Sequence, residues 1–573
     1  MTISPSTACP TAAGLLFPVL VLVALLASLW GPPQLLQRQG SFHWSAKPPQ
    51  QRALLTAEGG SREPPYKARY LAYPWALPVG DRRRGLVYRG SGKQLEHVAG
   101  KLLAGQPITA VAIGGSITAG MGSMGREFAW PGRFRAWLNA TFPHPGHVVV
   151  NKGVGATTSG LFALCLDTML AQQDVDLVIV EFSWNDVQGY TDFGSPDRKG
   201  FEQLLRKLLR HPSQPSLLLL HFYVWLRARY GTSLGGIYWE GSAETQLALF
   251  GQYYDIPSVS LRAGAYHLMR RGVGNFKADK PLVPDPGVSS ESGKPGEAFY
   301  FDYGHPTDFG HGVSGLDGAG SERALGMERV MAELVGEALY EAVVNLESER
   351  GSASQERKRG AGTADGNSNT TAAATDDRLM PAAEVPPPMV PGNAESGPST
   401  CFLQEGFKGV VSNASGFTYV AAKPSAATFT AQKWSWSGTQ PGHWAELTFD
   451  AREDPTRSQE SDASLKATRV ILGYLKSYES MGSAAVECVN GCECERTTLD
   501  GTWARKATLF QMHEFEVTQH PTCRLKVTVL PETRSGAHKV SLTFLMVSPF
   551  PVAHELRHFG EEHANGLVSQ MVS

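Results

Sequence analysis

The chain has 573 residues, a formal net charge of −2, 18% charged residues and 42% hydrophobic residues. This length allows a large hydrophobic core and predicts more than one domain. The balanced charge excludes the strongly basic composition of a nucleic-acid-binding protein, so we expect no nucleic-acid partner. We interpret the basic run Arg82-Arg83-Arg84 as a solvated loop.

An apolar segment lies near the N-terminus. Residues 12–30 carry no charge and, at about 19 residues, are long enough to cross a bilayer or to form the core of a signal peptide. We therefore predict a signal anchor or signal peptide over residues 1–30, which holds the chain at a membrane if it is not cleaved. Residues 31–65 are rich in Pro, Gln and Ser and are predicted to form a stem or linker.

The signals for cellular compartment disagree. Basic residues after the apolar segment favour a cytoplasmic C-terminal side. The sequons at Asn139, Asn369 and Asn413 are instead candidate N-glycosylation sites. Five of the seven cysteines lie in the C-terminal third, which is typical of disulfides formed in an oxidising compartment. We therefore predict a protein of the secretory pathway, either secreted or a single-pass membrane protein of the Golgi or cell surface with lumenal domains.

Residues 66–348 are predicted to form the first domain. Short apolar runs alternate there with helix-like segments, a pattern that indicates a parallel sheet covered by helices on both faces. The expected strands are residues 109–113, 148–151, 177–182, 216–222 and 258–261. The expected helices are residues 128–139, 161–172, 201–210, 244–254 and 323–346.

The rest of the chain is predicted to form a linker and a second domain. Residues 349–400 are rich in Ser, Thr, Ala, Gly and Pro and are expected to be a disordered linker. Over residues 401–552 apolar residues alternate, turn residues separate the runs and no long helix intrudes, which predicts an antiparallel β-sandwich. Residues 553–573 are expected to be a C-terminal tail.

A serine follows the first long apolar strand. Residues 109–113 end at Gly114-Gly115, and Ser116 comes next. This order places a hydroxyl on a tight strand-to-helix turn, where backbone N–H groups are free and a substrate can approach. A single serine in this position more often caps a helix, so its interpretation depends on three later segments.

Those three segments also follow predicted strands, and ligands bind at the carboxyl ends of strands in open α/β sheets. Residues 151–158 form a glycine-rich turn whose N–H groups could face a developing oxyanion. Asn185 could supply a further oxyanion donor from its amide. Asp302 lies three residues before His305, a spacing that lets the carboxylate orient an imidazole acting as general base to Ser116.

With these four segments, residues 105–346 resemble the SGNH (GDSL-like) hydrolase family. The matching blocks are Gly114-Gly115-Ser116 with Gly120, residues 151–157, Ser183-Trp184-Asn185-Asp186, and Asp302 with His305-Pro306. Three residues depart from the family pattern. Gly115 stands where the family has Asp, Ser183 where it has Gly, and Ala156 where the oxyanion glycine is usual.

The resemblance implies a three-layer α/β/α sandwich and an ester hydrolase. It implies Ser116 as nucleophile, His305 as base and Asp302 as the group that orients His305. The oxyanion hole would comprise the N–H of Ser116, the N–H of Ala156 or Gly155, and the Asn185 amide. No metal or organic cofactor is implied.

Four other motifs in the sequence are weaker candidates for functional sites. Asp308 and His311 repeat the Asp-His spacing, but Pro306 favours His305. His554-Glu555-Leu-Arg-His558 matches a zinc-peptidase motif with only 15 residues after it, too few for such a domain. The cysteines at 488, 492 and 494 lack a second ligand pair at zinc-finger spacing, so disulfides are favoured, with one of the five clustered cysteines left over. Residues 90–93 do not fit a phosphate loop.

The first functional hypothesis is a secretory serine esterase acting on small acyl esters, such as an acetyl group on a glycan. The first alternative is a Golgi-type polysaccharide O-acyltransferase that uses the same triad. The second is a glycan-binding protein with an inactive hydrolase domain. Aromatic residues of the second domain suit sugar stacking but also suit a core, namely Trp434, Trp436, Trp444 and Tyr474.

Overall fold

A computed structural model gives the structure of the chain. It describes residues 64–121, 123, 125–155, 157–170, 174–186, 191–223, 242–271, 273, 305, 327–361, 385–395, 399–403, 405–421, 434–452, 467–503 and 509–548. The apolar segment 12–30, the sequon at Asn369 and the zinc-peptidase motif at 554–558 lie outside these ranges. In the described part of the chain, no helix has the length and hydropathy needed to cross a membrane.

The first domain is built on a six-stranded sheet with strand order β1-β6-β5-β4-β2-β3. Neighbouring strands from β6 to β3 run parallel, and β1 pairs with β6 antiparallel at the edge. The strands are β1 (Leu86–Tyr88), β2 (Thr109–Gly114), β3 (Val148–Asn151), β4 (Leu177–Glu181), β5 (Ser216–His221) and β6 (Ser258–Ser260). The predicted parallel sheet is therefore confirmed, and β1 is an addition to it.

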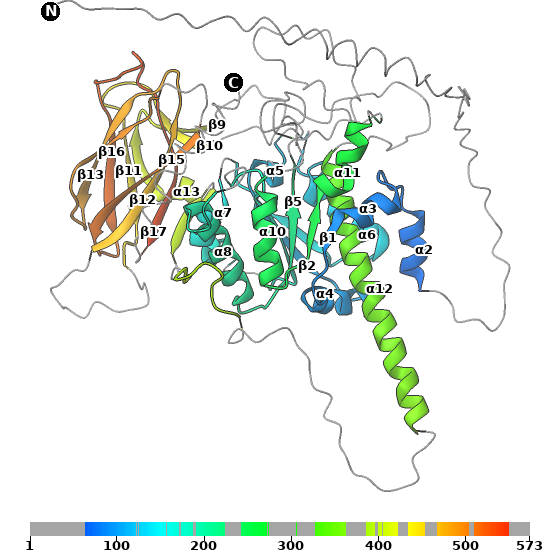
Figure 1. Ribbon diagram of the computed structural model, residues 1–573. Helices are drawn as coiled ribbons and strands as arrows, with labels where there is room; N and C mark the ends of the chain where they lie inside the picture. Colours follow the sequence, from blue (N-terminus) through cyan, green and yellow to red (C-terminus); the bar gives the residue numbers. More distant parts are fainter. Residues whose placement is uncertain are drawn as a thin grey trace, which may run out of the picture. The chain divides into compact units, whose positions relative to one another are not determined.

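Helices cover both faces of this sheet (Figure 1). They are α2 (Pro65–Ala72), α3 (Val79–Gly85), α4 (Lys93–Leu103), α5 (Ser116–Ala119), α6 (Trp130–Thr141), α7 (Ser159–Leu170), α8 (Pro196–Leu209), α10 (Glu244–Tyr253), α11 (Leu261–Arg270) and α12 (Met327–Ala361). Alternate residues of a strand point to opposite faces, so β2 sends Ala110 and Ala112 to one hydrophobic cluster and Val111 and Ile113 to the other. The three-layer α/β/α arrangement is confirmed.

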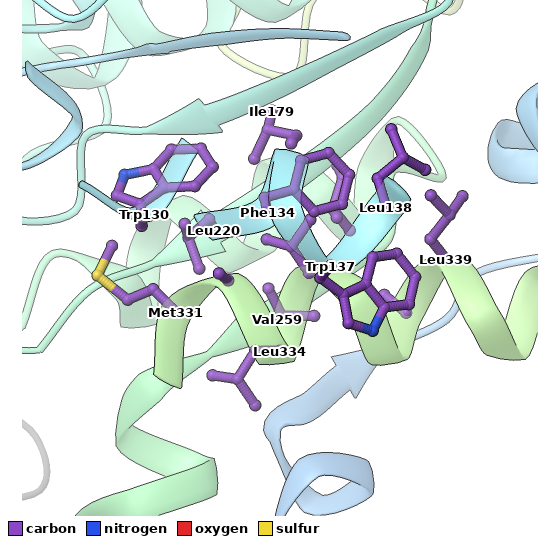
Figure 2. Packing of buried hydrophobic residues seen from close by; sticks show 14 of the residues in the cluster. Trp130, Phe134, Trp137, Leu138, Ile179, Leu220, Val259, Met331, Leu334 and Leu339 are labelled. Carbon is purple, nitrogen blue, oxygen red and sulfur yellow. The ribbon is translucent and has the colours of Figure 1, made fainter. Parts of the chain in front are cut away.

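The first of these clusters lies between the sheet and helices α6 and α12. Trp130, Phe134 and Trp137 of α6 are fully buried in the same cluster as Met331 and Leu339 of α12, which lie on their side of that helix (Figure 2). Ile179, Leu220 and Val259 supply the sheet side of the same cluster. These contacts fix α6 and α12 on the face of the sheet opposite to α7, α8 and α10.

The basic run at residues 82–84 is not a loop, and although Arg83 and Arg84 are exposed as expected, Arg82 is not. It lies in α3, and Arg82 is only 3% exposed. The Arg82 Nε donates to Glu337 Oε2 of α12 over 2.7 Å, and the Tyr70 hydroxyl donates to the same oxygen over 2.6 Å. A carboxylate from a distant helix therefore makes burial of this cation possible.

The predicted linker 349–400 has ordered parts at both ends. Helix α12 continues to Ala361, beyond the expected end at residue 346. Further on, residues 385–395 lie against α8, where the Asn393 amide and the Val390 N–H both donate to the Glu202 carboxylate. Val390 is buried in the second hydrophobic cluster. The attachment depends on a buried hydrogen-bond acceptor, the Glu202 carboxylate, which the composition of the linker does not reveal.

The second domain contains two antiparallel sheets, as predicted. One has the order β15-β12-β17-β10-β9, with β7 also paired to β17, and the other has the order β14-β13-β16-β11-β8. The strands are β7 (Thr400–Leu403), β8 (Val411–Ser415), β9 (Thr418–Ala421), β10 (Trp434–Gly438), β11 (Trp444–Phe449), β12 (Ala467–Lys476), β13 (Ser483–Asn490), β14 (Thr497–Asp500), β15 (Leu509–Thr518), β16 (Cys523–Val529) and β17 (Val540–Ser548). One short helix, α13 (Glu405–Val410), lies between β7 and β8.

The six cysteines that the structure describes form three disulfides. Cys488 pairs with Cys494 and Cys492 with Cys523, so the disulfide interpretation of this cluster is confirmed over zinc ligation. Cys401 is not left over, because it pairs with Cys165 of α7. This third disulfide joins the first domain to β7, and Phe544 and Met546 of β17 share a buried cluster with α7.

Candidate active site

The nucleophile turn is shaped by close approaches to its glycines. Strand β2 ends at Gly114 and α5 begins at Ser116, which is 6% exposed. A Cβ on Gly114 would lie 2.6 Å from the Glu181 carbonyl oxygen, and one on Gly115 would lie 2.1 to 2.3 Å from the Asn185 amide group. Both distances are too short for a real side chain. The glycines therefore let β4 and the Asn185 side chain approach the serine.

Ser116 lies next to the predicted histidine. His305 Nε2 lies 2.8 Å from Ser116 Oγ, although 189 positions separate the two residues. When the imidazole carries its proton on Nδ1, Nε2 accepts a hydrogen bond from the serine hydroxyl. This is the arrangement needed for general-base activation. Asp302, the predicted partner of His305, and the competing pair Asp308 and His311 lie outside the described residues.

The glycine-rich turn lies beside Ser116. Asn151 holds it in place, since its Nδ2 donates to the Thr118 carbonyl over 2.6 Å and its Oδ1 accepts the Gly153 N–H over 2.9 Å. A Cβ on Gly155 would lie 3.9 Å from Ser116 Cβ. Gly155 is thus next to the serine, as the predicted oxyanion hole requires, whereas Ala156 is not among the described residues.

Asn185 also lies at the turn. Its side chain packs against Gly115, and its Oδ1 is buried with no hydrogen-bond partner in the part of the chain that the structure describes. The next residue, Asp186, accepts hydrogen bonds from the Ser159 N–H over 3.1 Å and the Ser159 hydroxyl over 2.8 Å. This contact ties the Asn185 segment to the start of α7, directly after the glycine-rich turn.

Two buried carboxyl groups support the site, and neither was predicted to have a role. Burial, reinforced by the charge of Asp197, raises the pKa of Asp186 to about 8. Burial also raises the pKa of Glu181, at the end of β4, to about 8. The signal that could have revealed Glu181 is an acid ending an otherwise apolar strand.

The comparison with protein families agrees with this geometry. Residues 112–313 match the model of the GDSL-like Lipase/Acylhydrolase family. The chain therefore contains a GDSL-like lipase/acylhydrolase domain over these residues. The family resemblance predicted from the sequence is confirmed. A comparison with curated protein sequences gives no match.

Several solved structures are similar to the chain. A two-domain esterase active on acetylated mannans aligns with 82% of this chain and 99% of its own, at 18% identity and a TM-score of 0.46. An acetyl xylan esterase covers 41% of this chain and 100% of its own, at 15% identity and a TM-score of 0.27. A β-1,3-glucan-binding module from Bacillus halodurans covers 24% of this chain and 89% of its own, at 10% identity and a TM-score of 0.15. At these scores the similarities carry no argument about the substrate.

The contact between Gly115 and Asn185 leads to a testable expectation. In Gly115→Ala the new methyl group must displace the Asn185 amide, which is the free end of a side chain, so the fold survives while the amide moves. Loss of one oxyanion donor costs about 10²-fold in kcat or more. We expect a fall of this order in kcat for p-nitrophenyl acetate with an unchanged unfolding temperature.

The matched control is Gly351→Ala on α12, where an added Cβ meets nothing within 4 Å. It should leave kcat unchanged. A Gly115→Ala enzyme with the kcat of the wild type would show that the position of Asn185 does not matter for turnover.

Proposed function

We propose that this protein is a serine esterase that hydrolyses small acyl esters, acetyl esters above all, through an acyl-enzyme on Ser116. The observation that carries the proposal is the 2.8 Å contact between Ser116 Oγ and His305 Nε2 at the carboxyl end of the sheet. It joins a nucleophile and a base in the domain of a family of ester hydrolases.

In the proposed reaction, His305 takes the hydroxyl proton as Ser116 Oγ attacks the ester carbonyl carbon. Negative charge then develops on the former carbonyl oxygen. This oxyanion is stabilised by the N–H of Ser116, the N–H of Gly155 or Ala156, and the Asn185 amide. His305 returns the proton to the alcohol as the ester C–O bond breaks. Water then attacks the acyl-enzyme by the same route, with Asp302 orienting His305 throughout.

We propose an acylated glycan as the natural substrate. Among the four aromatic residues considered for sugar stacking, Tyr474 is buried and Trp436 packs on the core of the second domain. Trp434 is 45% exposed and stacks on Tyr419 with a centroid distance of 5.5 Å. An exposed ring held against a half-buried one supports contact with a pyranose face, so Trp434 is the residue we assign to it.

The experiment measures acetate release from acetylated oligosaccharides and from p-nitrophenyl acetate, with and without a non-acetylated acceptor sugar. An esterase releases acetate at the same rate in both cases. Transfer of the acetyl group to the acceptor in preference to water would instead establish the acyltransferase alternative, since the acyl-enzyme is common to both reactions. Binding without any turnover would establish the glycan-binding alternative.

We also propose that the protein enters the secretory pathway. The three disulfides support an oxidising compartment. Asn413 lies exposed on the edge strand β8 with Ser415 also exposed, which makes it the better placed of the two sequons that the structure describes. Asn139 lies within α6 and donates to the Arg135 carbonyl, and its Thr141 is fully buried.

For protein isolated from its native cells, we expect non-reducing peptide mapping to recover a Cys165–Cys401 cross-link. We also expect a glycosidase to increase its electrophoretic mobility. Free thiols at all described cysteines together with no change in mobility would place the protein outside that pathway.

A further inference from the structure

A buried acid lies directly beneath the nucleophile turn and has no part in the proposed triad. Glu181 ends β4 and is 0% exposed. Its Oε2 accepts a hydrogen bond from Thr118 Oγ1 over 3.1 Å. Its Oε1 is also buried and has no hydrogen-bond partner among the residues described. A carboxyl group is costly to bury in this way, so its presence here calls for a role.

Thr118 connects the nucleophile turn to three strands. Its hydroxyl reaches Glu181 on β4, and its carbonyl accepts the Asn151 amide of β3. Its side chain occupies the space that a Cβ on Gly114 of β2 would fill, at 2.1 Å from Oγ1. Thr118 lies two positions after Ser116 within the same turn of helix, so these contacts also fix the serine.

Helix α5 cannot hold this geometry alone. It spans only Ser116–Ala119, and one turn of helix does not form without tertiary contacts. The Ser116 hydroxyl must nevertheless stay within reach of His305, since a displacement of about 1 Å can cost about 10²-fold in rate. The orientation of α5 therefore depends on its tertiary contacts, which include those of Thr118 and the burial of Ile117 in the first cluster.

We propose that Thr118 and Glu181 form a positioning pair that fixes the Ser116 hydroxyl for attack, and that Glu181 does so as a neutral carboxylic acid. This inference rests on the proposed esterase activity. It assigns no chemical step to either residue, because the pair acts through the placement of Ser116.

The charges around Glu181 favour its neutral form. Burial raises its pKa to about 8, the hydrogen bond from Thr118 lowers it, and Asp186 raises it further when that residue is ionised. On the neighbouring strand β2, the residue paired with Glu181 is Gly114, which brings no charge. His221, at the end of β5, stays neutral because burial and Arg262 lower its pKa to about 3. Ionised Glu181 would place a negative charge near the developing oxyanion and oppose it.

The test compares Thr118→Val, Thr118→Ser and Glu181→Gln for kcat and KM on p-nitrophenyl acetate, from weakly acidic to alkaline pH. Thr118→Val keeps the shape and removes the hydroxyl. We expect it to lower kcat about tenfold while KM stays within about twofold, and Thr118→Ser to restore most of the loss. Glu181→Gln keeps an oxygen acceptor without a charge. We expect it to retain activity at neutral pH and to lose the wild type's fall in kcat above about pH 8.

The control is Thr543→Val on β17, a buried threonine with no hydrogen-bond partner among the residues described. It should leave kcat and its pH profile unchanged. The proposal is overturned if Thr118→Val matches the wild type, if Thr118→Ser is as slow as Thr118→Val, or if Glu181→Gln keeps the alkaline fall.

A second readout separates this inference from the proposed function. A fluorophosphonate labels an activated serine without ester turnover, and its rate of attachment to Ser116 ranks the same variants. A wild type that hydrolyses no ester but labels faster than Thr118→Val refutes the proposed function and supports the positioning pair. Equal labelling rates for both overturn the pair.

Discussion

Ser116→Ala should lose at least about 10³-fold in kcat for any ester that the wild type hydrolyses, because it removes the atom that forms the acyl-enzyme. His305→Ala should lose a similar factor, since Nε2 lies 2.8 Å from that atom and is the base that activates it. The double variant should be no slower than either single one, because the two residues act as a unit. Initial rates with p-nitrophenyl acetate measure all three variants.

Ser216→Ala provides the matched control for these substitutions. Ser216 is fully buried at the amino end of β5, and its hydroxyl has no hydrogen-bond partner within the described ranges. Removing that hydroxyl should leave kcat unchanged. Turnover that persists undiminished in both Ser116→Ala and His305→Ala would contradict the assignment of the nucleophile and the base.

The largest effect on stability should come from the buried ion pair between α3 and α12. Arg82 Nε and Glu337 Oε2 are 2.7 Å apart, and their side chains are 3% and 0% exposed. The Arg82 guanidinium also lies over the Trp75 ring at 3.7 Å from its centroid. In Arg82→Met the Glu337 carboxylate loses this cation while it remains buried. Breaking a buried pair in this way costs about 3–5 kcal/mol, and urea unfolding followed by tryptophan fluorescence measures it.

A neighbouring ion pair supplies the comparison. Arg89 Nε donates to Glu341 Oε2 over 3.0 Å, but the Arg89 side chain is 53% exposed. Exposed pairs contribute about 0–1 kcal/mol, so Arg89→Met should change the free energy of unfolding by no more than that. If Arg82→Met and Arg89→Met destabilise equally, burial of the Arg82 pair does not have the energetic role assigned to it.

The fold could be predicted where the pattern is local. The expected strands of the first domain all form because short apolar runs bounded by turn residues leave little alternative inside a covered sheet. Arg82 was misread because its partner, Glu337, is 255 positions away in the sequence. The Cys165–Cys401 disulfide was missed for the same reason, since 236 positions separate its cysteines. Tertiary partners at such distances leave no local signal.

The residues of the candidate site likewise fall into those with a local sequence signal and those known only from tertiary contacts. The sequence singled out Ser116 from a strand that ends in glycines and His305 from a motif that resembles the family's, and the structure brings the two side chains together. Thr118 and Glu181 carry no motif, and their importance follows only from burial and from the contact between them. Asn185 was predicted as an oxyanion donor, but its packing against Gly115 required the structure.

Direct detection of the acyl-enzyme tests the central claim most closely. The wild type is mixed with p-nitrophenyl acetate, quenched in acid within the first turnovers and digested, and the peptides are examined by mass spectrometry. We expect one acetyl group on the peptide that contains Ser116, located on that serine by fragmentation, and none in Ser116→Ala. Acetylation at another residue that accounts for turnover, with Ser116 unmodified, would contradict the claim.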